Sequence, residues 1–227
     1  MKKNGLLAFV FAAFGLLCVY GSLSAAEPAG KDLFKDATLA DFDYYLDEGA
    51  KKEDVFSLKD GVLTITGKPF GWLETKKDYK NFVLKAEFRY PEKEKAINSG
   101  LFLRINKRAD HFLPRCIEVQ LAPSGLGDLF GFRNMKMSGS QERSSSNDHH
   151  KLVGIFHGVK KYRNGASSDL SKWQKIEISC FEDAIAVKVN GKLVNVAVEA
   201  ENIEGKIGFQ SEGGLIEFKN VILKEEN

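Results

Sequence analysis

An excess of charge of either sign is missing from this 227-residue sequence once its first residues are set aside. The whole chain holds 33 lysines and arginines against 31 aspartates and glutamates, and Lys2 and Lys3 are the only charged residues before Glu27. Residues 27–227 therefore carry 31 charges of each sign. Nucleic acids and anionic lipid surfaces are bound through an excess of basic charge. The neutral balance argues against both partners and favours an uncharged small molecule.

Long apolar runs are also missing beyond the N-terminus, where no segment approaches the roughly 20 apolar residues that a membrane span needs. The N-terminus itself reads as a positive start at Lys2 and Lys3, an apolar stretch over residues 5–20 and small residues at 24–26. This is the pattern of a cleaved secretory signal. The sequence predicts a signal peptide over residues 1–26, a single domain over residues 27–227, and a periplasmic or secreted protein with no membrane attachment after cleavage.

Cysteine and histidine are scarce, with three and four residues in the chain. None of their spacings resembles a structural zinc site. Cys116 and Cys180 remain after signal cleavage, and in an exported protein they either form a disulfide or stay as two free thiols. No Gly-x-Ser-x-Gly motif, phosphate-binding loop or dinucleotide fingerprint is present either.

Strand signals, in contrast, are frequent, and no convincing long amphipathic helix or internal repeat accompanies them. Asp60-Gly61 and Asn190-Gly191 are two-residue turn signals, which predict hairpins over residues 55–66 and 184–198. The resulting registers place apolar residues opposite one another on one face: Phe56 with Ile65 and Leu58 with Leu63 in the first hairpin, Ile185 with Val196 and Val187 with Val194 in the second.

The remaining segments continue the same alternation. Strands are expected over residues 82–90, 98–105, 116–121, 173–181, 205–210 and 216–223, whereas residues 122–147 are expected to form a long loop. Many short alternating strands with a turn about every ten residues are typical of an all-β sandwich or barrel. We therefore expect two antiparallel sheets and less than about a tenth of the mature chain in helices.

Two central strands carry the candidate site. Successive side chains of a strand point to opposite faces, so Phe102 and Arg104 share one face and Glu118 and Gln120 share the polar face of the next strand. Asn98 is in phase with Arg104. On the concave face of a curved sandwich these groups would meet a ligand. The alternative is that Arg104 and Glu118 form an ordinary cross-strand ion pair.

Gln210, Trp72, Phe102 and His157 are also candidates, and the last three each have a plainer alternative. Gln210 is in phase for the same face. Trp72, beside Gly71, presents its ring to a sugar or belongs to the core, and Phe102 lies under a sugar or fills space. His157 is an acid or base that reaches the face, or a surface or core histidine.

Glu118 has no second carboxylate in phase on its own strand, where its neighbours are Cys116 and Gln120. Ordinary glycosidases need two carboxyl groups placed around the bond that they cleave. The strand is therefore a poor match to an ordinary glucanase.

Six short motifs, in order along the chain, nevertheless resemble one family. They are Gly71-Trp72-Leu73-x-Thr75, residues 98–104, Glu118-Val119-Gln120, Asn190-Gly191, residues 205–210 and residues 217–221. Together they resemble the 3-keto-disaccharide hydrolase domain, also described as a 3-keto-glucoside lyase or hydratase. The resemblance implies an all-β concanavalin A-like jelly-roll sandwich of two antiparallel sheets.

The resemblance also implies a reaction that removes the C2 proton of a 3-keto-glycoside, eliminates the C1 oxygen and then adds water. Glu118 or His157 would be the base, and Arg104 would stabilise the enolate unless a divalent metal ion did so as a Lewis acid. The substrate, a small carbohydrate, would be bound by Gln120, Trp72, Phe102, Asn98 and Gln210. The alternative is a non-catalytic carbohydrate-binding module on the same sandwich. A lectin needs no isolated carboxylate, so Glu118 favours the enzyme.

Overall fold

A computed structural model describes residues 30–92, 97–107, 111–166 and 169–226 as two packed antiparallel sheets of eight strands each. The predicted signal peptide lies outside the described residues. Helix is confined to three short elements in the described part of the chain: η1 (Leu39–Asp41), η2 (Asp47–Gly49) and α1 (Lys52–Val55). The predicted all-β fold with two antiparallel sheets and almost no helix is confirmed.

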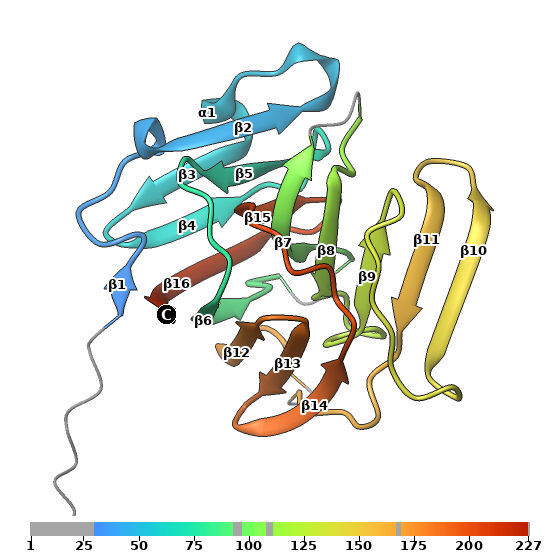
Figure 1. The fold of residues 1–227 in the computed structure, drawn as a ribbon. Helices are drawn as coiled ribbons and strands as arrows, with labels where there is room; N and C mark the ends of the chain where they lie inside the picture. Colours follow the sequence, from blue (N-terminus) through green and yellow to red (C-terminus); the bar gives the residue numbers. More distant parts are fainter. Residues whose placement is uncertain (1–29, 93–96, 108–110, 167–168, 227) are drawn as a thin grey trace, which may run out of the picture.

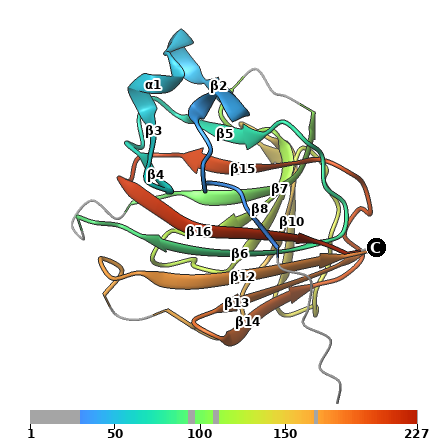
Figure 2. The ribbon, with the colours of Figure 1, turned by 90° about the vertical axis from the view of Figure 1, so that its left-hand side faces the viewer.

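Sheet A forms one layer of the sandwich, and Figure 2 shows β16, β6, β12, β13 and β14 running side by side across the molecule. The strand order is β14-β13-β12-β6-β16-β4-β3, with β1 also paired to β16. Its strands are β1 (Lys31–Asp32), β3 (Phe56–Lys59), β4 (Val62–Ile65), β6 (Phe82–Arg89), β12 (Gln174–Phe181), β13 (Ala184–Val189), β14 (Lys192–Ala197) and β16 (Ile216–Glu225).

Sheet B forms the other layer, and β7, β8, β9, β11 and β10 stand side by side on the right of Figure 1. The strand order is β10-β11-β9-β8-β7-β15-β5-β2. Its strands are β2 (Phe42–Leu46), β5 (Gly71–Thr75), β7 (Gly100–Lys107), β8 (Arg115–Gln120), β9 (Leu129–Phe132), β10 (Ser144–His150), β11 (Gly154–Val159) and β15 (Lys206–Ser211).

The main hydrophobic core fills the space between the sheets. Alternation along β6 buries every second residue, because Phe82, Leu84, Ala86 and Phe88 face this core while their neighbours face outward. Leu101 and Leu103 of sheet B meet them from the other side. Burial of such apolar side chains is the main source of the sandwich's stability.

The two predicted hairpins differ in outcome. The first is confirmed, with Phe56 paired to Ile65 and Leu58 to Leu63. The second hairpin forms, but its predicted register is wrong: a bulge between Val187 and Lys188 pairs the strands as Ile185 with Ala197 and Val187 with Asn195. The fully buried Asn195 amide donates hydrogen bonds to the backbone oxygens of Gly127 and Val159, at 2.9 and 2.8 Å. These tertiary contacts offer a reason for the bulge that hairpin alternation could not reveal.

The expectation of one long loop over residues 122–147 is also wrong. This segment contains β9 and the start of β10, and both strands extend sheet B through β11. The segment lacks the apolar alternation that predicts strands, because it is rich in glycines and polar residues. β10 in particular is an exposed edge strand made of Ser, Asn, Asp and His. The two cysteines are both free and buried, so they form no disulfide with each other. No helix in the described residues is long and apolar enough to cross a membrane.

Arg104 does not share a face with Glu118, and this prediction is corrected here. The pairing of β7 with β8 shifts register between Leu103 and Lys107, and Arg104 has a positive φ of 55°. The bulge inserts an extra residue, so that Phe102 and Ile105 face one way although they are three positions apart.

Arg104 instead ties sheet B to the turns of sheet A. Its fully buried guanidinium donates hydrogen bonds to the backbone oxygens of Lys80, at 3.3 Å, of Glu182, at 2.6 Å, and of Glu201. Burial lowers the pKa of this guanidinium. A close approach of Gly205, where a Cβ would lie 2.7 Å from the Arg104 Cα, lets β15 pass beside the bulge.

Replacing Arg104 should therefore affect stability. Arg104→Met removes the donors to three backbone oxygens and should lower the free energy of unfolding by about 2–4 kcal/mol, measured by urea denaturation. Arg163→Met is the matched control, because Arg163 is exposed and lies over the Tyr162 ring, and it should cost less than about 1 kcal/mol. Equal losses in the two variants would contradict the structural role given to Arg104.

Candidate active site

The face of sheet B that is turned away from sheet A, called the outer face here, carries a second hydrophobic cluster. Its buried members are Trp72, Phe102, Ile105, Leu113, Cys116, Phe132 and Val153, and Tyr45, Phe112, Phe130 and Phe156 pack against them. Glu118 lies among these residues, because it pairs with Phe102 on one side and Phe130 on the other. The predicted placement of Glu118 on this face is confirmed.

Glu118 occupies space that a glycine leaves free. Gly100 stands opposite Gln120, two pairs along from Glu118, and a Cβ at Gly100 would overlap the Glu118 carboxyl group and lie 2.8 Å from its Cγ. The carboxyl group therefore lies across the backbone of β7 instead of pointing into solvent, and Glu118 is 2% exposed. Its Oε1 atom is buried and has no hydrogen-bond partner.

Gln210 lies next to this carboxyl group. On β15, Gly208 pairs with Phe102 and Gln210 pairs with Trp72, so Gln210 is in phase with both outer-face aromatics. Its side chain is fully buried, and neither its oxygen nor its nitrogen makes a hydrogen bond of ordinary geometry. Buried polar atoms are almost always satisfied in proteins. Unsatisfied atoms on two adjacent side chains are what a polar ligand would complete.

Glu212, which sequence reasoning missed, supplies a second carboxyl group from another strand. It follows Gln210 by two residues, in the connection between β15 and β16. The next glycines bring this connection against residues 97–98, since a Cβ at Gly214 would lie 3.2 Å from the Asn98 oxygen. Asn98 adds another buried and unpartnered side-chain oxygen. One sequence signal could have indicated Glu212. It lies two residues after Gln210, a predicted site residue, and in an extended chain that spacing places both side chains on the same face.

The two carboxyl groups differ in electrostatic environment. Burial and, to a smaller extent, repulsion from Glu212 raise the pKa of Glu118 well above its ordinary value. Burial also raises the pKa of Glu212, to about 7, while the nearby Gln210 amide partly offsets the shift at both groups. Tyr90, whose hydroxyl donates to the Leu121 oxygen at 3.1 Å, has a raised pKa for the same reasons. Burial therefore favours the protonated form of Glu118, and Glu212, with a pKa of about 7, is close to its midpoint at neutral pH.

Trp72 and Phe102 do not present their rings to a ligand, so the predicted sugar-contacting role is wrong for both and the core alternative holds. Both are fully buried. Tyr45 stacks on Trp72 with ring centroids 4.7 Å apart, and the indole nitrogen donates to Glu74 at 2.7 Å. Phe102 meets Trp72 edge-on at 6.2 Å. These rings support the strands that carry Gln210 and Glu118.

Gln120 lies on the rim of the site, half-buried, with its side-chain oxygen accepting from the Ala122 N–H at 2.7 Å. His157 does not join it. Its neighbour Phe156 packs with the outer-face aromatics, so alternation turns His157 to the opposite face, where its Nε2 lies 3.3 Å from the Asn134 Oδ1. The expectation that His157 reaches the candidate site is wrong.

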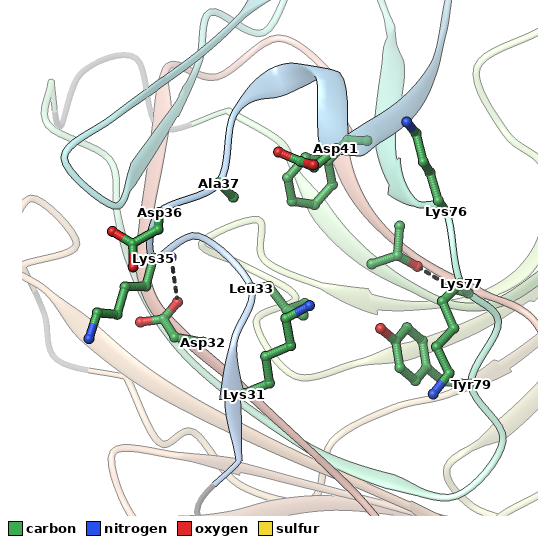
Figure 3. Close-up of a pocket in the computed structure, with 12 residues that line it drawn as sticks. Lys31, Asp32, Leu33, Lys35, Asp36, Ala37, Asp41, Lys76, Lys77 and Tyr79 are labelled. Carbon is green, nitrogen blue, oxygen red and sulfur yellow. Dashed lines mark hydrogen bonds between the residues drawn. The ribbon is translucent and has the colours of Figure 1, made fainter.

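Figure 3 shows a different hollow, of about 310 Å³, lined by residues 31–42 and 75–79. Three of its charged groups are already engaged: Asp32 accepts from the Phe34 N–H, Asp41 accepts from the Thr38 N–H, and Lys77 pairs with Glu225. It contains none of the predicted site residues. Among the described residues, four of the five buried side-chain polar atoms without a hydrogen-bond partner belong instead to Asn98, Glu118 and Gln210, so we take the outer face as the candidate site.

Metal ligands are not grouped in the described part of the chain, where no set of three or more His, Cys, Asp or Glu residues is placed to hold an ion.

Comparison with known proteins identifies a family for this chain. Residues 29–224 match the 3-keto-alpha-glucoside-1,2-lyase-like domain. The chain belongs to this family. No curated protein matches the sequence. Family membership supports a role in acting on carbohydrates.

Solved structures share the fold at low identity. A putative glycosyl hydrolase from Parabacteroides distasonis is 16% identical with a TM-score of 0.61, over 88% of this chain and 94% of that one. A second from the same organism is 20% identical with a TM-score of 0.54, over 78% and 93%. A carbohydrate-binding module, CBM66 from Bacillus subtilis, is 12% identical with a TM-score of 0.54, over 75% and 91%. At these identities the likeness concerns the fold.

The raised pKa of Glu118 predicts a pH-dependent cost of folding. An acid that holds its proton more tightly in the folded state stabilises that state below its ordinary pKa of 4.5, and the effect is lost as pH rises toward the folded pKa. The glutamine in Glu118→Gln cannot ionise, so the variant does not lose stability at this position as pH rises. Relative to wild type, the variant should gain about 1–3 kcal/mol of unfolding free energy between pH 4.5 and pH 8, measured by urea denaturation.

The matched control is Glu53→Gln, which alters an exposed acid. Its difference from wild type should stay constant over the same pH range. A constant difference for Glu118→Gln as well would show that Glu118 ionises normally in the folded protein.

Proposed function

We propose that this protein is an exported enzyme that cleaves 3-keto-glycosides by removing the C2 proton and eliminating the C1 oxygen, followed by hydration. The observation that carries the proposal is the cluster of unsatisfied polar atoms around two carboxyl groups of unequal acidity, Glu118 and Glu212. Family membership of residues 29–224 supports the substrate class. Export rests on the signal sequence predicted over residues 1–26.

The reaction needs only groups that this site contains. A ketone at C3 acidifies the C2 proton, and a carboxylate takes that proton. The C–H electron pair forms a C2–C3 double bond, and the ketone oxygen becomes an enolate. When the enolate collapses back to a ketone, a C1–C2 double bond forms and the C1 oxygen leaves with its electron pair and gains a proton. Water then adds across the C1–C2 double bond and gives the free 3-keto sugar.

Enolate formation requires a base on one side and a hydrogen-bond donor at the ketone oxygen. A correctly placed base contributes about 10²–10⁴-fold, and a preorganised donor a comparable factor. The buried protonated Glu118 and the Gln210 amide are suitable donors because burial strengthens their electrostatic effect. Arg104 lies outside this set, since its guanidinium is bound to backbone oxygens elsewhere.

The substrate requirement tests the proposal. The mature protein should release the aglycone from a 3-keto-glucoside, leave the unoxidised glucoside intact, and exchange the C2 proton with solvent deuterium during turnover. Sugar release followed by chromatography and deuterium followed by NMR measure both. Hydrolysis of the unoxidised glucoside at a comparable rate without deuterium at C2 would contradict the elimination mechanism.

A carbohydrate-binding module is the second candidate, because a buried protonated carboxyl group and two amides also suit recognition of sugar hydroxyls. Binding of both sugars without release from either, measured by calorimetry on the same samples, would favour the module over the enzyme.

A further inference from the structure

We infer that Glu212 is the base of this site and that Glu118 acts in its protonated form as the donor to the ketone oxygen. The inference rests on the proposed function and deepens it. The family resemblance implies Glu118 or His157 as the base. The fold turns His157 away and brings Glu212 to Glu118 from the β15–β16 connection, which changes the assignment.

The placement of the two groups argues for this division. Glu118 lies across Gly100 on a central strand, enclosed by Phe102 and Phe130, with 2% of its surface exposed. Glu212 lies on a connection at the end of β15 and is half-buried. The base holds the C2 proton until the leaving oxygen takes it, and exchange of that proton with solvent deuterium needs a group that reaches water. A donor to an oxyanion works best when water is excluded.

The charges around the pair point the same way. Repulsion from Glu212 raises the pKa of Glu118 on β8. Both carboxyl groups also raise the pKa of Tyr90 at the end of β6. Gln210 on β15 interacts with both carboxyl groups. Among the described residues, no lysine or arginine lowers the pKa of either group. Two nearby carboxyl groups without a cation favour a state with one proton between them, and the more buried group keeps it.

The step balances without a further reactant. The Glu212 carboxylate takes the C2 proton, and the C–H electron pair moves into the C2–C3 bond. The ketone oxygen gains negative charge and accepts a hydrogen bond from the Glu118 carboxylic acid. On collapse of the enolate, the C1 oxygen leaves and takes the proton from Glu212, which returns that residue to its ionised form.

Glutamine substitutions separate the two roles, because an amide can still donate a hydrogen bond but cannot take a proton from carbon. With a 3-keto-glucoside, Glu212→Gln should lose C2 deuterium exchange and aglycone release together, by about 10²–10⁴-fold. Glu118→Gln should keep both within about tenfold, whereas Glu118→Leu, which has no donor, should lose about 10²–10³-fold.

The pH profile gives a second readout. The wild-type rate should rise with pH through about 7 as Glu212 ionises, and this rise should be absent from the residual rate of Glu212→Gln. Glu212→Asp keeps a carboxylate and should keep the rise at a reduced rate, which distinguishes a base from a merely structural residue. Glu217→Gln, which alters the partner of Arg89 on sheet A, is the control and should leave rate and profile unchanged.

Two results separate the possible failures. Loss of exchange in Glu118→Gln with exchange retained in Glu212→Gln would overturn the inference and make Glu118 the base. No exchange and no release by the wild-type protein would overturn the proposed function itself. Circular dichroism and calorimetric binding of the unoxidised glucoside should show that each variant is folded.

Discussion

The candidate site depends on the burial of one carboxyl group, that of Glu118, in a sheet face that is otherwise aromatic and aliphatic. An ionised carboxylate in such surroundings is costly unless it is paired, and among the described residues no lysine or arginine lowers the pKa of Glu118. Burial therefore raises the pKa of this group and favours its protonated form. Gly100 makes this placement possible because any side chain at that position would occupy the space of the carboxyl group. A carboxylic acid that stays neutral at neutral pH is a hydrogen-bond donor, which an ordinary glutamate is not.

The rest of the fold holds this face in place. Arg104 closes one end of the sandwich by binding backbone oxygens of sheet A turns, and its bulge lets Ile105 join the outer-face cluster. The stacked Tyr45 and Trp72 rings support β5 beside β15. Gln210 and Glu212 can then approach Glu118 from a strand that is nearly a hundred residues away in sequence. The site is thus assembled by sheet pairing and not by one local motif.

How far the sequence predicts this structure depends on the range of the interaction. Alternation and turn residues predicted the sandwich, the first hairpin and the shared face of Glu118, Gln120 and Gln210, because these follow from local geometry. Arg104, His157 and the second hairpin were misplaced. A bulge reverses alternation at Arg104, and tertiary hydrogen bonds of Asn195 accompany the shifted register. His157 faces away because its neighbour Phe156 packs with the outer-face aromatics, a tertiary contact. Glu212 was missed because a search for a paired carboxylate along one strand does not examine the neighbouring connection.

The central claim, that Glu118 is neutral and Glu212 titrates near neutrality, can be measured directly. In protein with carbon-13 at the glutamate side-chain carboxyl carbons, NMR signals assigned through Glu118→Gln and Glu212→Gln should be followed from pH 3 to pH 9. The account predicts that the Glu212 signal shifts with a midpoint of about 7 and that the Glu118 signal remains at its protonated position beyond that pH. Midpoints near 4.5 for both groups would contradict it.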